Sequence, residues 1–220
     1  MLFFNVYKKQ GKDFASAWYN RKMKIKKKIN VYDIFMFPLE AFVLKRLRRQ
    51  LMPKAKGDIL EIGAGTGANL AFYQSETIGT LTIADKEVGR ALKKAMQTSS
   101  CHCVDADVLC LPFSDNSFDT VVETLVLCSV SDVPAALAEI RRVLRKDGQF
   151  IHIDHGLPKA NGLKRVFKSL APTWYKMSRS CKIDKVYEPD FMDAGFKPDQ
   201  QGYAGFGVFY WGISKPMKKD

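Results

Sequence analysis

The chain has 220 residues, enough for one α/β domain and a short appendage but too few for two ordinary domains. Its 46% apolar and 26% charged content is ordinary for a globular protein and excludes neither an enzyme nor a binding module. Residues 1–56 hold 15 of the 35 Lys and Arg but only three of the 23 Asp and Glu, so the remaining residues carry 20 basic and 20 acidic groups. The net charge of +12 therefore belongs to a basic arm, residues 1–56, ahead of a neutral domain, residues 57–220.

The opening sequence MLFFNVYKKQGK has only a short apolar run and no cleavage site of small residues, so we expect no secretory signal. The apolar stretch 31–44 contains Asp33, Pro38 and Glu40 and is shorter than the roughly 20 residues that span a bilayer. The five cysteines are odd in number, which is typical of a reducing compartment. These features predict a cytoplasmic protein, with peripheral contact to the inner face of a membrane left open.

Two helices are predicted in the basic arm. Residues 13–30 interleave cations with apolar residues, and a second helix runs from near Pro38 to Leu51 with apolar residues at helical spacing. Such a surface suits an anionic membrane, where each cation contributes on the order of 1 kcal/mol, and we expect this contact through residues 13–51. A solvated helix face and nucleic-acid binding are the alternatives.

After Pro53 the sequence predicts alternating strands and helices. Apolar strands without a polar face, separated by helices, indicate a parallel sheet covered on both sides. Two late strand-like runs are too close together for a crossover helix, so they are predicted to form an antiparallel hairpin. In chain order we expect strands at 58–62, 80–84, 101–104, 118–123, 149–154, 197–203 and 206–213, and helices at 67–74, 86–97 and 134–144.

Alternating glycines at 63, 65 and 67 allow a sharp backbone turn and the close approach of a ligand. The same residues fit the GxGxxA pattern of a dinucleotide-binding turn, and Asp85 lies where that pattern places its ribose-binding acid. A dehydrogenase is therefore one interpretation. The negative charge of Glu61 would repel a pyrophosphate. It would attract a ligand that carries an ammonium and a sulfonium.

Four motifs in order resemble those of the class I S-adenosylmethionine-dependent methyltransferases: LEIGAGTG, the acid in TIADKE, DVLCLPFSDNSFDTVV and EIRRVLRKDGQF. The resemblance implies a Rossmann-like, doubly wound α/β fold with strand order 3-2-1-4-5-7-6 and an antiparallel last strand. It also implies S-adenosyl-L-methionine as cofactor and S-adenosyl-L-homocysteine as product. Asp147 departs from the usual proline or glycine of its turn, and Lys86 from an uncharged residue, without disturbing either motif.

The resemblance also assigns roles to individual residues. Asp107 is the acid implied at the adenine, and Asp105, two residues earlier, is the alternative for this role. Glu123 contacts the methionine end or the substrate, or is a purely structural acid. The implied cofactor site consists of Glu61, Gly63, Ala64, Gly65 and Gly67 around the methionine portion, Asp85 at the ribose, Asp107 with Val108 at the adenine, and Lys86 and Glu123.

Methyl transfer needs the nucleophile, methyl group and sulfur held in line, and a general base is optional. We expect His155, at the end of the fifth strand, to be that base, with an ordinary hydrogen-bonding histidine as the alternative. Tyr32 is predicted to reach the methionine carboxylate or the acceptor from a lid formed by the arm. Cys101, His102 and Cys103 are too close in sequence to form a zinc site, so no metal is expected.

The segments VYDIFMFPLE and LPFSDNSFD resemble the ubiquinone/menaquinone-biosynthesis-like branch and the phospholipid N-methyltransferases. HIDHG, APTW, RSCKID and FMDAGF are similar to membrane-associated thiol methyltransferases. These resemblances imply a small lipophilic acceptor, either a phospholipid amine, a quinol or a thiol. An RNA methyltransferase and a non-catalytic S-adenosylmethionine-binding regulatory module are the alternatives, although the chain lacks an NPPY-like amine motif.

Overall fold

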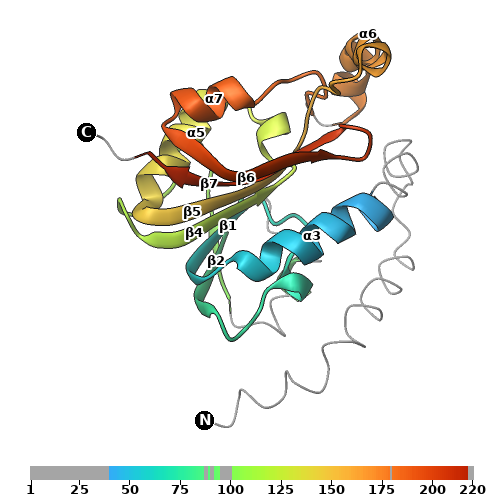
Figure 1. Cartoon of the computed structure of the whole chain (residues 1–220). Coiled ribbons are helices and arrows are strands. Elements are labelled where there is room, and N and C mark those ends of the chain that lie inside the picture. The colour runs from blue at the N-terminus through green and yellow to red at the C-terminus, as the bar shows by residue number, and fades with distance from the viewer. Residues whose placement is uncertain (1–39, 87–88, 90–91, 95–100, 179, 218–220) are drawn as a thin grey trace.

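A computed structural model describes residues 40–86, 89, 92–94, 101–178 and 180–217 (Figure 1). The predicted helix over 13–30 and Tyr32 lie outside these residues. Of the predicted helix over 86–97, residues 86, 89 and 92–94 are described; residues 92–94 are helical, and 86 and 89 are not.

A seven-stranded mixed sheet forms the centre of the fold, in the order β3-β2-β1-β4-β5-β7-β6. Strands β1 to β5 pair in parallel, whereas β7 is antiparallel to both β5 and β6. This confirms the predicted topology and the closing hairpin. The strands are β1 Gly57–Ile62, β2 Ile78–Asp85, β3 His102–Asp105, β4 Phe118–Thr124, β5 Leu144–His155, β6 Phe196–Ala204 and β7 Phe209–Pro216.

Helices cover both faces of this sheet. The helix α3 (Lys45–Leu51) lies on one face, and α5 (Val133–Val143) and α7 (Glu188–Asp193) lie on the other (Figure 1). Neighbouring residues of a strand point to opposite faces, so Ile59 packs with the α3 side and Leu60 with the α5 side, and both are fully buried. Burial on both faces explains why the strand sequences lack a polar alternation.

The described part of the basic arm packs into the core. A π-helical turn, Glu40–Leu44, leads into α3, and a 3-10 turn, Met52–Lys54, follows it. Leu47 and Leu51 of α3 are buried against Ile59 of β1. The sheet therefore covers part of the apolar face of the predicted second helix, whereas Phe42 on the same helix is 78% exposed. The division of the chain at residue 56 stays a prediction.

The predicted helix over 67–74 is wrong. Gly67 has a φ of +74°, which a right-handed helix cannot include, and only a 3-10 turn, Leu70–Phe72, follows. Sequence analysis also missed α6 (Asn161–Met177), which contains Pro172 and buries only Ala171. Its apolar residues Leu163, Val166, Leu170 and Trp174 recur at helical spacing, so the helix was predictable from the sequence despite Pro172. The fifth strand begins at Leu144, earlier than the predicted 149. No helix among the described residues is both long and apolar enough to cross a bilayer.

Arg142, in the last turn of α5, fastens the loop between β3 and β4. Its Nη2 donates to the carbonyl oxygen of Leu111 at 2.9 Å and its Nη1 to that of Phe113 at 2.7 Å. The same guanidinium forms ion pairs with Glu139 and Asp115, at 2.7 and 2.9 Å. Two sequence motifs that lie far apart in the chain, LPFSDNSFD and EIRRVL, are thus parts of one contact.

We expect Arg142→Ala to lower the free energy of unfolding by about 1–3 kcal/mol, because two carbonyl oxygens and two carboxylates lose a charged donor. Urea unfolding measures this difference. Lys146→Ala, which removes an exposed cation just after α5, is the matched control and should change stability by less than about 0.5 kcal/mol. Equal stability of the two variants would contradict the role of Arg142.

Candidate functional site

The candidate site lies at the carboxyl ends of the parallel strands, where ligands bind in open α/β sheets. The loop after β1 carries the glycines, Asp85 ends β2, and His155 ends β5. β1 lies between β2 and β4, and β4 pairs with β5. The topology therefore gathers residues from distant parts of the sequence at one edge of the sheet.

The glycine loop adopts a backbone that only glycine accommodates without strain. Gly63, Gly65 and Gly67 have φ angles of +64°, +55° and +74°. A Cβ on Gly63 would lie 2.4 Å from a methyl of Val126, whereas one on Gly65 would meet only a carbonyl oxygen at 3.9 Å. The loop is thus packed on one side and open at Gly65. Asp85 lies at this point, because its Oδ2 accepts from the Gly65 N–H at 2.8 Å.

Glu61 lies within a buried polar network. Its side chain is 1% exposed, and its two oxygens accept from Asn69 Nδ2 at 3.1 Å and Tyr73 Oη at 2.8 Å. Arg48 Nε of α3 donates to Asn69 Oδ1 at 3.0 Å. Burial raises the pKa of Glu61 to about 7 against the lowering effect of these partners. Sequence analysis missed Asn69, Tyr73 and Arg48, although Asn69 is a polar residue in the otherwise apolar run ANLAF.

The predicted ribose and adenine residues lie close together. Lys86 Nζ is 2.6 Å from Asp107 Oδ2, and this contact lowers the pKa of Asp107. The N–H of Leu109 donates to the other oxygen of Asp107 at 3.0 Å, and Val108 is buried. Asp105 is exposed and pairs in register with Asp85 across β2 and β3. The choice of Asp107 over Asp105 stays a prediction.

Glu123 of β4 and Asp154 of β5 form a buried acidic pair. Burial, with the nearby carboxyl of Asp154, raises the pKa of Glu123 well above its usual range, and burial raises the pKa of Asp154 to about 6. Glu123 accepts from the N–H of Val126 at 3.2 Å, and Asp154 from that of Cys128 at 3.0 Å. The pair therefore holds the loop after β4, which supports the structural interpretation of Glu123. Its contact with a ligand stays a prediction.

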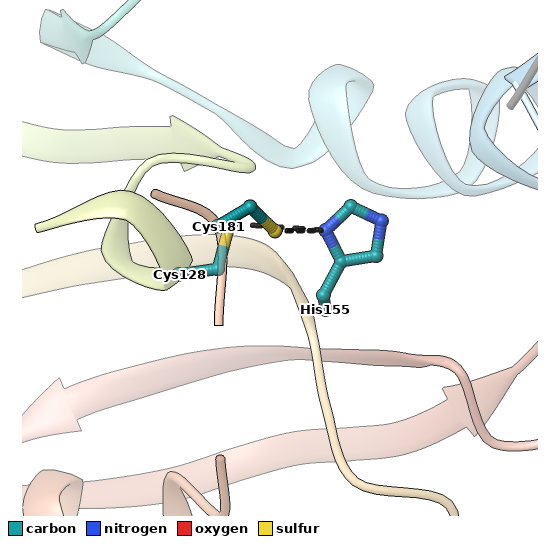
Figure 2. Close-up of side chains that lie close together, drawn as sticks. All are labelled: Cys128, His155 and Cys181. Carbon is teal, nitrogen blue, oxygen red and sulfur yellow. Dashed lines mark hydrogen bonds between the residues drawn. The ribbon is translucent and has the colours of Figure 1, made fainter. Parts of the chain in front are cut away.

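His155 lies beside two thiols (Figure 2). Its Nδ1 is 3.7 Å from Cys128 Sγ and 3.3 Å from Cys181 Sγ, and the three residues are 1%, 1% and 3% exposed. Cys128 and His155 lower the pKa of the Cys181 thiol to about 5. The expected histidine is thus enclosed rather than open to solvent. Sequence analysis missed this cluster because Cys181 comes from the segment after α6, and no spacing along the chain relates it to the other two residues.

The open side of the glycine loop, the adjacent Asp85 and the Lys86–Asp107 pair fit a cofactor with a nucleoside and a charged amino-acid end. The fold and this edge together define an α/β enzyme that binds such a cofactor.

Comparison with known proteins identifies the family within this class of enzymes. The family model described as "Methyltransferase domain" matches residues 60–152. The mouse protein thiol S-methyltransferase TMT1B is 30% identical over 186 residues, which cover 77% of this chain and 76% of that protein. Human thiol S-methyltransferase TMT1A is 28% identical, and the match covers 70% of this chain and 66% of that protein. The crystal structure of YcgJ from Bacillus subtilis superposes with a TM-score of 0.61 at 18% identity, over 80% of this chain and 98% of that chain.

The chain belongs to the class I S-adenosylmethionine-dependent methyltransferases, and its cofactor is S-adenosylmethionine. The dehydrogenase interpretation of the glycine loop is therefore wrong.

Glu61→Gln tests the buried carboxyl. In the cofactor-free protein the pKa of Glu61 is about 7, against 4.5 without burial, so its contribution to stability is complete below pH 4.5 and is lost as the pH rises through 7. The free energy of unfolding of the wild type should fall relative to the variant across this range, by up to about 3 kcal/mol. Urea unfolding at several pH values measures the difference between the two proteins. A difference that is independent of pH would contradict the shifted pKa.

Gly65→Ala tests the open side of the loop. The added Cβ would project into the open space beside Gly65, where we expect the cofactor to bind. The dissociation constant for S-adenosylmethionine should therefore rise by about tenfold or more in calorimetric titration. Gly195→Ala is the matched control, because Gly195 has a similar φ of +78°, has open space and lies between α7 and β6. Both variants should lose about 1–2 kcal/mol of stability from backbone strain. Equal cofactor affinity in the two variants would contradict the assignment of the loop.

Proposed function

We propose that this protein methylates the sulfur of a small, lipophilic thiol. The observation that carries the proposal is the extent of the match to mouse thiol S-methyltransferase TMT1B. The match covers 77% of the chain, whereas the methyltransferase domain model covers residues 60–152. The similarity therefore continues beyond the part of the chain that a shared cofactor explains.

S-adenosylmethionine supplies a methyl group on a sulfonium sulfur. The acceptor sulfur forms a bond to the methyl carbon while the bond from that carbon to the sulfonium sulfur breaks. The electron pair of the broken bond stays on S-adenosylhomocysteine, and the proton of the thiol passes to solvent.

The chain's own residues would hold the cofactor at the glycine loop. Asp85 is placed to accept from ribose hydroxyls, and Asp107 with Val108 to bind the adenine. Lys86 would set the position of Asp107 through their ion pair. Glu61 would act on the ammonium of the methionine end through its charge, because its two oxygens already accept from Asn69 and Tyr73. The identity of these contacts is part of the proposal.

The acceptor would approach at the ends of β4 and β5. The loop after β4 is largely apolar, and Leu125 and Val126 pack against the core of the α5 side. A thiol needs less help to lose its proton than a phenol, so a dedicated base is optional. A catalytic role for His155, and a lid that brings Tyr32 to the site, remain proposals.

Two observations bear on the alternatives. Residues 57–220 carry equal numbers of basic and acidic groups, so a polyanion such as RNA gains no net attraction from the domain.

In the arm, α3 turns its apolar face to the sheet, which leaves exposed cations such as Arg46 and Arg49 for a membrane surface. We propose peripheral membrane contact through these cations and the basic residues that precede them. A purely regulatory, non-catalytic module is excluded if any acceptor is methylated.

The test incubates the full chain with S-adenosylmethionine labelled in the methyl group and separate pools of alkyl and aryl thiols, phospholipid amines, quinols and RNA. We expect label in a thiol product, and at least a tenfold lower kcat/KM for Asp85→Ala at limiting cofactor, because a carboxylate at the ribose is lost. Asp147→Ala, at an exposed position in β5, is the control and should keep the wild-type rate. Label in RNA or in a phospholipid, or in no pool, would contradict the proposal.

A further inference from the structure

We propose that Cys128, His155 and Cys181 bind a zinc ion whose fourth coordination position is taken by the thiolate of the acceptor. The metal site rests on the geometry of these three residues alone. The identity of the fourth ligand rests, in addition, on the proposed thiol methylation.

The geometry of the cluster is close to that of a zinc site. Both sulfur atoms face the same nitrogen, His155 Nδ1, at 3.7 and 3.3 Å, and the three ligand atoms lie within 4.8 Å of one another (Figure 2). Tetrahedral zinc, with bonds of about 2.3 Å to sulfur and 2.0 Å to nitrogen, places sulfur and nitrogen about 3.5 Å apart. Small side-chain adjustments therefore suffice for binding.

The surroundings hold the three ligands in place. The N–H of Lys182 donates to the carbonyl oxygen of Cys128 at 2.7 Å, which joins the two cysteine segments next to the cluster. The N–H of Cys128 is held by Asp154, and the ring of Phe209 packs against His155 with 5.2 Å between centroids. These contacts restrain the backbone of Cys128 and the ring of His155.

Coordination to a metal would give His155 a stronger partner than a neutral thiol. The hydrogen-bond contacts of its Nδ1 are to the two cysteine sulfurs, at 3.7 and 3.3 Å. Its Nε2 is buried and has no partner within the described part of the chain. A metal bound at Nδ1 would replace the two sulfur contacts and leave Nε2 as it is.

Three protein ligands leave one position open. Among the described residues the group contains no fourth histidine, cysteine or carboxylate. Zinc with three protein ligands keeps its fourth position for water or substrate, and a thiol that coordinates it loses its proton. Cys128 lies two residues after Val126, whose methyl lies beside Gly63, so the cluster is close to the glycine loop.

This site would activate the proposed acceptor without a general base. On coordination the thiol gives its proton to solvent. The thiolate sulfur then forms the bond to the methyl carbon as the bond from that carbon to the sulfonium sulfur breaks, and the electron pair stays on S-adenosylhomocysteine. The thioether product is a poorer ligand than the thiolate and leaves the metal.

The experiment measures metal binding first. The full chain is purified in the presence of reductant, stripped of metal and titrated with zinc against a chromophoric chelator. We expect stoichiometric binding by the wild type and by Cys110→Ser, whose exposed cysteine lies outside the cluster. Cys128→Ser and Cys181→Ser should bind at least a hundredfold more weakly. His155→Gln, which keeps both cysteines, should also bind more weakly, and near-UV circular dichroism checks that each variant is folded.

Cobalt(II) then reports on the ligands independently of activity. The wild type should show a thiolate-to-cobalt charge-transfer band that is weaker in both cysteine variants, each of which keeps one thiolate, and a small alkyl thiol should shift the d–d bands. Failure of the folded wild type to bind zinc or cobalt would overturn the metal site. So would equal binding by the wild type and all cluster variants, or a Cys128–Cys181 disulfide in metal-free protein kept under reductant.

The experiments can overturn the zinc site and the proposed thiol methylation separately. If zinc binds at the cluster but no thiol accepts a methyl group, the metal site stands, and both the thiol ligand and the proposed function are overturned. If metal-free protein methylates thiols at the full rate, the proposed function stands and the role of the fourth position is overturned.

Discussion

The amide of Asn69 connects three parts of the structure that would otherwise be independent. It accepts from Arg48 of α3 and donates to Glu61 of β1 and to Thr124 at the end of β4. A buried carboxyl and a buried guanidinium each need partners, and one small side chain serves both. The glycine loop lies between Glu61 and Asn69 in sequence, so this network fixes both of its ends.

This constraint explains why the segment after the loop is a 3-10 turn. Continuing as a helix from Gly67 would rotate Asn69 along a helix surface and remove its amide from Glu61. Helix propensity in the run ANLAFY is overridden by the cost of an unpartnered buried carboxyl. It also explains why part of the basic arm belongs to the fold: Arg48 comes from α3, and its partner comes from the loop.

The periodic strands, the hairpin and the strand order follow from local pattern and from the resemblance of four motifs. Two of those motifs form one contact in the structure. Arg142 of the motif EIRRVLRKDGQF donates to carbonyl oxygens of the loop that the motif DVLCLPFSDNSFDTVV forms. The Cys128–His155–Cys181 cluster could not be predicted in this way. Cys128 follows β4 and His155 ends β5, but Cys181 lies in the segment after α6, and no spacing along the sequence relates it to the other two. Asn69 was equally hidden, because a single amide carries no periodicity.

The bond between the Lys182 N–H and the Cys128 oxygen has a consequence for how this chain can vary. It joins the segment that follows α6 to the loop after β4, whereas the Asn69 network joins α3 to β1 and to the end of β4. Changes of length or sequence in α6 would therefore reshape the surroundings of His155 and leave the glycine loop anchored. The two parts of the candidate site therefore depend on different contacts, and the His155 side can change while the glycine loop keeps its conformation.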